Sequence, residues 1–254
     1  MDSRKALDPG TIRLSDGLGG YKEYYIKCEI GRGGSCITYD GSYISNQGVP
    51  ISVHIKEFYP YKLDIKREPD GNLSVGPSDL AKYESHRERV AQSFKKHSEL
   101  FGMNGLTNYL AVPENIFFAN NTIYMVTAYS QGRILTADHD WSVRDIIGMH
   151  INLLNTIFRL HQAGYLYLDL KPGNIWILEG QPQLQRLLDF DSILPVNYED
   201  RSTWDYKICF TRGFAPVEQQ EGDLRKIGKW SDIYSILSFN SFSTKNYTNN
   251  KFSA

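Results

Sequence analysis

The stretch Tyr167-Leu168-Asp169-Leu170-Lys171-Pro172-Gly173-Asn174 is the most informative part of the chain, and it lies between a predicted helix and a predicted strand. A carboxylate such as Asp169 can accept the proton of a hydroxyl group. The ammonium of Lys171 can offset charge on a phosphoryl group in transfer, and the amide oxygen of Asn174 can ligate a hard metal ion. We therefore interpret this loop as a site for phosphoryl chemistry; a solvated surface loop is the alternative.

A second acidic segment, Leu187-Leu188-Asp189-Phe190-Asp191, follows fifteen residues after Asn174. Its apolar residues predict a strand that delivers the Asp189 carboxylate at its end. A divalent cation that bridges phosphates could bind there. Taken alone, the segment could equally be any strand that ends in an acid, but the strand–turn–strand pattern between Asn174 and Asp189 allows the two side chains to converge.

Two segments of the N-terminal half fit the same chemistry. The glycines of Ile30-Gly31-Arg32-Gly33-Gly34-Ser35-Cys36-Ile37-Thr38-Tyr39 would let backbone N–H groups approach phosphate oxygens, although an ordinary β-hairpin turn explains them equally well. In Val53-His54-Ile55-Lys56 the alternation of a strand predicts Val53 and Ile55 on one face and His54 and Lys56 on the other. An edge-strand lysine is the alternative interpretation of Lys56.

These four segments, in this order, resemble the signature set of the eukaryotic-type (Hanks-type) Ser/Thr protein kinase domain of bacterial kind. Gly213-Phe214-Ala215-Pro216-Val217-Glu218-Gln219 is similar to the A-P-E motif of bacterial members. Trp230-Ser231-Asp232-Ile233-Tyr234-Ser235 resembles the opening of the helix that supports the catalytic loop. The resemblance covers about Tyr24 to Ile236, and six motifs in sequence make coincidence very improbable.

The resemblance implies an α+β, two-lobed kinase-like fold. It consists of an antiparallel β N-lobe with one helix and a mainly helical C-lobe that lacks its last helices. The strand-like and helix-like periodicities agree with this order, with helices expected at about 78–101 and 143–163 and an exposed insertion at 59–78. The expected divisions are a flexible lead-in (1–23), the N-lobe (24–129), a partial C-lobe (130–237) and an irregular tail (238–254).

The resemblance also implies a role for each matching residue. Asp169 would be the catalytic base and Lys171 would stabilise the γ-phosphoryl group, while Asn174 and Asp189 would hold Mg²⁺. ATP would be held by Gly31, Gly33 and Gly34 over the phosphates, Lys56 on the α- and β-phosphates, Thr127 as gatekeeper, and Ala128 and Tyr129 as hinge. Tyr167 and Phe190 would stack in the hydrophobic spine.

The chain departs from the kinase pattern at several positions. The third loop glycine is Cys36, preceded by Ser35, so the loop would close less tightly over ATP. Leu168 replaces the arginine of H-R-D, which removes the usual cation for a phosphorylated activation loop. The helix glutamate that pairs with the strand lysine aligns with His97, and Glu99 lies two residues further on. The remaining departures are Tyr167 for the histidine of H-R-D and Asp191 for the glycine of D-F-G.

The residues after Leu237 are rich in Ser, Asn and Thr and lack an apolar helical face. Measured against a kinase, the chain looks truncated or frameshifted, which would expose apolar surface of the larger lobe and remove the arginine partner of Glu218. The chain is therefore expected to be either an active Ser/Thr kinase that uses ATP and Mg²⁺, or a non-catalytic ATP-binding or scaffold module. A small-molecule kinase is a third alternative, and candidate modification sites are Ser202, Thr203 and Thr211.

Composition also argues against several other classes of protein. The 254 residues carry a net charge of −1, which offers no overall attraction for nucleic acid or an anionic membrane. The three cysteines form neither a disulfide framework nor a metal-ligand spacing. No secretory signal or membrane span is evident. We expect a cytoplasmic protein whose partners are ATP and a protein substrate that the sequence does not identify.

Overall fold

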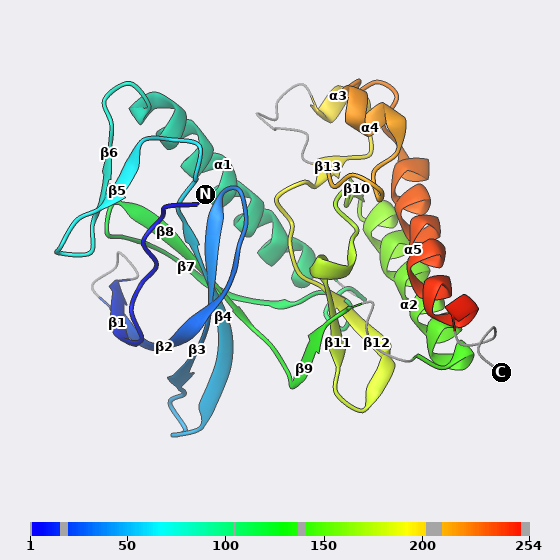
Figure 1. The fold of residues 1–254 in the computed structure, drawn as a ribbon, viewed down its shortest axis with the longest axis horizontal. Coiled ribbons are helices and arrows are strands. Elements are labelled where there is room, and N and C mark those ends of the chain that lie inside the picture. Colours follow the sequence, from blue (N-terminus) through cyan, green and yellow to red (C-terminus); the bar gives the residue numbers. More distant parts are fainter. Residues whose placement is uncertain (1, 16–19, 104, 137–140, 202–209, 250–254) are drawn as a thin grey trace. The chain divides into compact units, whose positions relative to one another are not determined.

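The computed structural model describes residues 2–15, 20–103, 105–136, 141–201 and 210–249, with the backbone alone at 182 and 240–249. The chain divides into two compact units, which Figure 1 displays. The first comprises Met1–Ser98 and Val112–Ser130, and the second comprises Glu99–Ala111 and Gln131–Ala254. Within the described residues, no helix combines the length and apolarity needed to cross a bilayer.

The first unit is built on a curled antiparallel sheet with the strand order β1-β2-β3-β4-β8-β7. One buried cluster lies on this sheet and includes Tyr24, Tyr39 and Val126, and a second lies between the sheet and α1 and includes Phe58 and Phe94. The elements are β1 (Gly10–Ser15), β2 (Tyr21–Arg32), β3 (Cys36–Ile44), β4 (Pro50–Phe58), β5 (Ile65–Arg67), β6 (Leu73–Val75), α1 (Leu80–Phe101), β7 (Val112–Ala119) and β8 (Thr122–Ala128).

The second unit is organised around α2, whose N-terminus is capped by the Ser142 hydroxyl, which accepts from the Asp145 N–H at 3.1 Å. Gly164, with φ +89°, follows the helix end as the sequence predicts. The elements are β9 (Gly132–Ile134), α2 (Val143–Gln162), β10 (Tyr165–Leu166), a short 3₁₀ turn (Pro172–Asn174), β11 (Ile175–Leu178), β12 (Gln181–Leu187), β13 (Leu194–Pro195), α3 (Tyr198–Arg201), α4 (Val217–Glu221) and α5 (Lys229–Asn249).

The segment expected to be a flexible lead-in is ordered over most of its described length. Gly10–Ser15 forms β1, which pairs antiparallel with β2, and Leu14 is buried in the core of the sheet. Arg4 is also buried. The lead-in expectation is wrong here because polar residues such as Arg4 find distant hydrogen-bond partners, the carbonyls of Gly33 and Tyr59, that no local pattern reveals.

The insertion at 59–78 is not simply exposed. Its β5–β6 hairpin packs Leu73 into the core and brings the Arg67 side chain, 5 % exposed, against a buried glutamate of β4. The segment between β12 and Glu221 contains β13, α3 and α4, and Arg201 of α3 is buried. The insertion at 59–78 was misjudged because Leu73 and Arg67 are anchored by residues outside it, Asn120 and Glu57.

The tail expected to be irregular from residue 238 instead continues α5 to Asn249. Ile236 and Phe239 pack into the core of the second unit, and the Ser238 hydroxyl donates to the Tyr234 carbonyl at 2.9 Å. Once the first turns of a helix are fixed by packing, each added residue costs little, so weak formers can follow. The last five residues of the tail lie outside the described part of the chain.

Candidate functional site

The Asp169 carboxylate is the centre of a polar cluster in the second unit. The Lys171 ammonium lies 2.7 Å from its Oδ2, and the Asn174 side-chain amide donates to the same oxygen at 2.8 Å. The Thr211 hydroxyl donates to Oδ1 at 3.2 Å and accepts from the Lys171 Nζ, also at 3.2 Å. The structure therefore brings together Asp169, Lys171 and Asn174, which the sequence interpretation grouped, and adds Thr211.

Thr211 was considered in the sequence only as a modification site. Its hydroxyl lies forty-two positions from Asp169 along the chain and is bound to both charged partners of the cluster. A hydroxyl engaged in this way completes the cluster rather than being offered to solvent. The other two candidate modification sites, Ser202 and Thr203, lie outside the described residues.

The pKa of the Asp169 carboxyl is raised from its ordinary value. Burial is the largest cause, and the nearby Asp189 carboxylate adds to the rise, while Lys171 and Asn174 act in the opposite direction. A carboxylate in such a setting is a better proton acceptor than a free aspartate. The geometry therefore suits a general base for a hydroxyl proton.

The backbone of this loop is held by a buried carboxylate from α5. Asp232, which is fully buried, accepts the N–H groups of Tyr167 at 3.0 Å and Leu168 at 2.7 Å, and it also lies 2.7 Å from the His161 Nε2. Leu168 has φ +64°, a conformation that is unfavourable for a residue with a side chain. The Gln219 side-chain amide donates a hydrogen bond to the Leu168 carbonyl.

These contacts hold the backbone immediately before Asp169. Sequence reasoning flagged Asp232 through the Trp230–Ser235 motif. It missed His161, for which no local signal exists. Gln219 is the last residue of the segment that resembles the A-P-E motif, but its contact with Leu168 was not predicted.

Asn174 and Asp189 are linked through the backbone. The Leu188 N–H, one residue before Asp189, donates to the Asn174 carbonyl at 3.0 Å, and the Asp189 Oδ1 accepts the Asp191 N–H at 3.2 Å. The Asn174 amide nitrogen faces Asp169, and its side-chain oxygen accepts no hydrogen bond from the residues that the structure describes, so it can bind another donor or a cation. An amide oxygen and a carboxylate suit Mg²⁺, which is commonly held by few protein oxygens together with phosphates.

No three His, Cys, Asp or Glu side chains gather as a ready-made metal group within the described residues. A site made from one carboxylate, one amide oxygen and the phosphates of a nucleotide is compatible with that finding. Nearby, the rings of Tyr167 and Phe190 meet edge to face with centroids 5.5 Å apart, and both side chains are buried. The predicted contact between these two rings is therefore present.

The first unit contains the other predicted residues, Gly31, Gly33, Gly34, Lys56, Thr127 and Tyr129. Val53 and Ile55 are fully buried while Lys56 lies on the opposite face of β4, as the alternation predicts. The strand register places Thr38 of β3 between Gly31 and Lys56, since Thr38 pairs with both. Two strand spacings, about 10 Å, thus separate the glycine segment from the lysine.

Tyr129 and His54 form a contact at the end of the sheet. Their rings lie 4.1 Å apart between centroids, and the Tyr129 hydroxyl donates to the Asp40 Oδ1 at 2.5 Å. Burial lowers the pKa of His54 to about 4, so this imidazole is neutral at pH 7. Thr127, the predicted gatekeeper, pairs with His54 across the β4–β8 ladder. The ring of Tyr129, a predicted hinge residue, packs against the same histidine.

His97 is buried near the end of α1, with its ring 6.1 Å from the Phe94 ring, whereas Glu99 is exposed. His97 belongs to the first unit and Glu99 to the second. Because an α-helix has 3.6 residues per turn, these two side chains, two positions apart, point about 200° apart around the helix axis. Which of them faces Lys56 stays a prediction.

Comparison with known proteins gives one informative match. No family model matches the chain. Serine/threonine-protein kinase D of Synechocystis sp. is 29% identical over 154 residues, which cover 59% of this chain and 30% of that kinase. The chain thus aligns with less than a third of the kinase it resembles. This partial similarity, with the Asp169 cluster, indicates a relation to the kinases.

Proposed function

We propose that this chain is a protein Ser/Thr kinase that transfers the γ-phosphoryl group of ATP to a protein hydroxyl, with Asp169 as the catalytic base. The observation that carries the proposal is the convergence of Lys171, Asn174 and Thr211 on one carboxylate of raised pKa. The partial similarity to a bacterial Ser/Thr kinase supports the same reaction class.

In this proposal the residues position the reactants and offset charge, which is most of what phosphoryl transfer demands. Asp169 accepts or orients the hydroxyl proton, and Lys171 lies beside it to balance negative charge on the transferring group. Asn174 and Asp189 would hold Mg²⁺, which supplies neutralisation of the phosphate oxygens when bound. Lys56 and the glycine-rich turn would hold the triphosphate, next to Thr127 and Tyr129.

The deciding experiment compares the unaltered chain with Asp169→Asn in Mg²⁺-dependent transfer of labelled phosphate, including autophosphorylation. Loss of a general base is expected to lower the rate by about 10²- to 10⁴-fold. Asp223→Asn is the matched control, because Asp223 pairs with Arg225 at the surface of the same unit. Equal label incorporation by Asp169→Asn and the unaltered chain would contradict the assignment.

A non-catalytic nucleotide-binding module is the second candidate. It is favoured by His97, which is buried where the kinase resemblance expects a glutamate, and by Ser35 and Cys36 in the glycine-rich turn. Calorimetric binding of Mg-ATP without any phosphate transfer would support this candidate over the kinase.

A further inference from the structure

The glycine-rich turn between β2 and β3 is held by its carbonyl groups. The Gly33 carbonyl accepts from the Arg4 Nη2 at 2.8 Å, the Gly34 carbonyl from the Tyr61 N–H at 3.2 Å, and the Ser35 carbonyl from the Tyr59 N–H at 2.8 Å. Three successive carbonyls are therefore fixed by donors outside the hairpin. The Ser35 hydroxyl also lies 3.1 Å from the His86 Nε2 of α1.

This arrangement determines which way the amides of the turn point. In a trans peptide the C=O and the following N–H point to opposite sides of the chain. Fixing the carbonyls of Gly33 and Gly34 therefore directs the N–H groups of Gly34 and Ser35 away from those donors. Neither amide donates to an acceptor within the part of the chain that the structure describes, so both are available to an anion.

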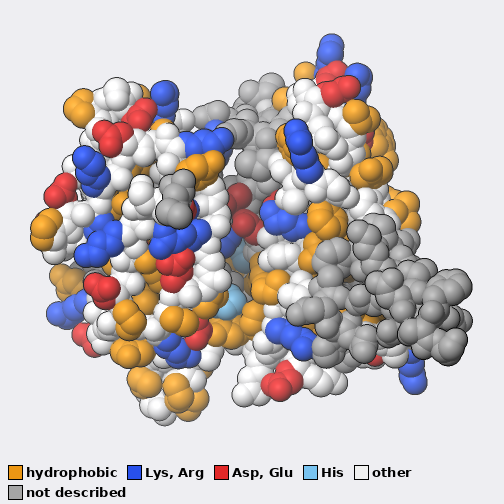
Figure 2. Space-filling view, viewed as in Figure 1, with side chains coloured by type: hydrophobic (Ala, Val, Ile, Leu, Met, Phe, Trp, Pro, Cys, Tyr) orange, Lys and Arg blue, Asp and Glu red, His pale blue; other side chains and the backbone are white. Residues whose placement is uncertain are grey.

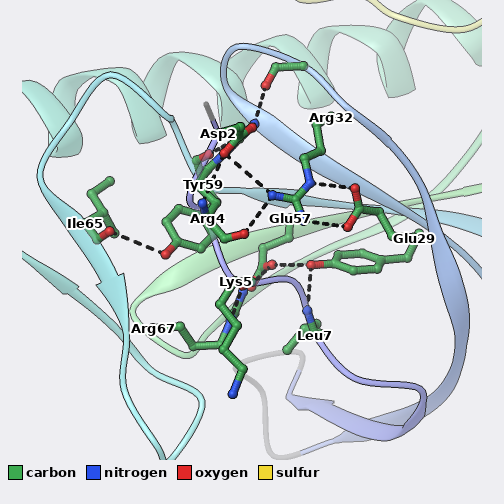
Figure 3. A network of polar contacts seen from close by, with 12 residues as sticks. Asp2, Arg4, Lys5, Leu7, Glu29, Arg32, Glu57, Tyr59, Ile65 and Arg67 are labelled. Atoms are coloured by element: carbon green, nitrogen blue, oxygen red, sulfur yellow. Dashed lines mark hydrogen bonds and ion pairs between the residues drawn. The ribbon is translucent and has the colours of Figure 1, made fainter.

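Of the three donors that hold these carbonyls, Arg4 lies farthest along the sequence from its acceptor. Its side chain is 5 % exposed, and it donates from Nη1 to the Tyr59 carbonyl and from Nε to the Asp2 carboxylate at 3.0 Å. The Arg4 carbonyl in turn accepts from the Arg32 Nη1 at 2.7 Å, one residue before Gly33. Arg4 is thus bound to Arg32 and Gly33, two consecutive residues at the β2 end of the turn, and Figure 3 shows Arg4 beside Arg32.

The segment that carries Arg4 is anchored again a few residues later. The Lys5 carbonyl accepts from the Arg67 Nε at 3.0 Å, and the Leu7 N–H donates to the Tyr39 hydroxyl at 3.0 Å. Tyr39 and Arg67 both bind the buried Glu57 carboxylate on β4, the strand that carries Lys56. Residues 2–7 therefore form a strap that is fixed at one end to the turn and at the other to Tyr39 of β3 and Arg67 of β5.

We propose that this strap positions the glycine-rich turn for nucleotide phosphate and that Arg4 is a positioning residue for ATP binding. The inference rests on the proposed nucleotide-binding function. Removing the guanidinium frees the Gly33 carbonyl while the Gly34 and Ser35 carbonyls stay bound, so the Gly33–Gly34 peptide must be ordered when the ligand binds rather than beforehand. Because preorganisation contributes directly to affinity, Arg4→Ala is expected to weaken Mg-ATP binding about five- to tenfold.

The test uses the full chain with Arg4→Ala, Arg4→Lys and Asp2→Asn, and Arg13→Ala as the matched control. Arg13 lies on β1 of the same unit with a side chain that is 64 % exposed. Hydrogen exchange of the Gly33 amide, which donates to the Cys36 carbonyl at 2.9 Å, reports the order of the turn without nucleotide. Calorimetry with Mg-ATP then gives the dissociation constant.

Faster Gly33 exchange and weaker ATP binding in Arg4→Ala, smaller changes in Arg4→Lys and Asp2→Asn, and no change in Arg13→Ala are expected. Unchanged exchange would overturn the proposal whatever the affinity. Faster exchange with unchanged affinity would also overturn it, because the turn would then be uncoupled from the ligand. If the unaltered chain binds no Mg-ATP, the proposed function itself fails, and this inference with it.

Discussion

At the scale of single residues, the environment of Asp169 makes a testable statement about protonation. Its raised pKa comes first from burial and then from Asp189, and Lys171 opposes both. Lys171→Met removes the ammonium at 2.7 Å and is expected to raise this pKa further. Carbon-13 NMR titration of the carboxyl groups measures the shift directly, without depending on activity.

Asp223 is the internal reference in the same spectra, since Arg225 holds its pKa below the ordinary value. It should titrate unchanged in Lys171→Met. The folded chain holds its Asp169 proton to higher pH than the unfolded chain does, so the stability due to this group is lost as pH rises through the folded pKa. An Asp169 pKa that is unchanged or lower in Lys171→Met would contradict the described cluster.

At the scale of elements, the β5–β6 hairpin is attached to the sheet by a buried ion pair. The Arg67 Nη2 lies 2.6 Å from the Glu57 Oε2, and the hydroxyls of Tyr39 and Tyr124 donate to the same carboxylate at 2.8 and 2.9 Å. Burial is the largest cause that raises the pKa of both tyrosines, and the Glu57 carboxylate is the second. The two hydroxyls therefore stay protonated and act as donors. All four side chains thus form one satisfied network.

Arg67→Met leaves the Glu57 carboxylate buried with no cation and is expected to destabilise the first unit by about 3–5 kcal/mol. The double variant Glu57→Gln with Arg67→Met removes the buried charge and should recover most of that loss. Hydrogen exchange of the β4 and β8 amides measures the free energy of opening. Lys66→Met, on an exposed position of the same hairpin, is the control. A double variant as unstable as the single one would refute this account.

At the scale of the whole molecule, the surface includes a face of mixed charge on the first unit and an exposed apolar stripe on the second. Figure 2 shows basic and acidic side chains interspersed over the face of the first unit, with hydrophobic side chains gathered at the tip of the β3–β4 hairpin, where Ile44 is 66 % exposed. In the second unit an apolar stripe follows one side of α2. Its members are Ile147, Ile151, Leu154 and Phe158, each between 43 and 59 % exposed.

The stripe on α2 is an exposed apolar surface whose residues adjoin one another along the helix. It should bind a hydrophobic dye such as ANS in the native state. Replacing Ile151 and Phe158 by Gln should lower ANS fluorescence while changing the free energy of unfolding by less than about 0.5 kcal/mol, because both side chains are at the surface. Phe118→Gln, at an exposed position in the first unit, serves as the control. Equal dye fluorescence in the double variant and the unaltered chain would show that the stripe is covered.

The sequence by itself determined what depends on local spacing. The alternation that buries Val53 and Ile55 and leaves Lys56 on the other face needs only the geometry of a strand. The helix ending before Gly164 and the contact of Asp169 with Lys171 follow from neighbours a few residues apart. Short-range periodicity and turn chemistry are enough for these features.

Only the tertiary structure decided the contacts between distant residues. The Thr211 hydroxyl on Asp169, Arg4 on the Gly33 carbonyl and the burial of Glu57 under Arg67 all join segments that carry no matching local signal. A polar side chain looks the same in a sequence whether it faces water or a buried partner. The difference arises when packing removes water and the polar groups that remain must bind one another.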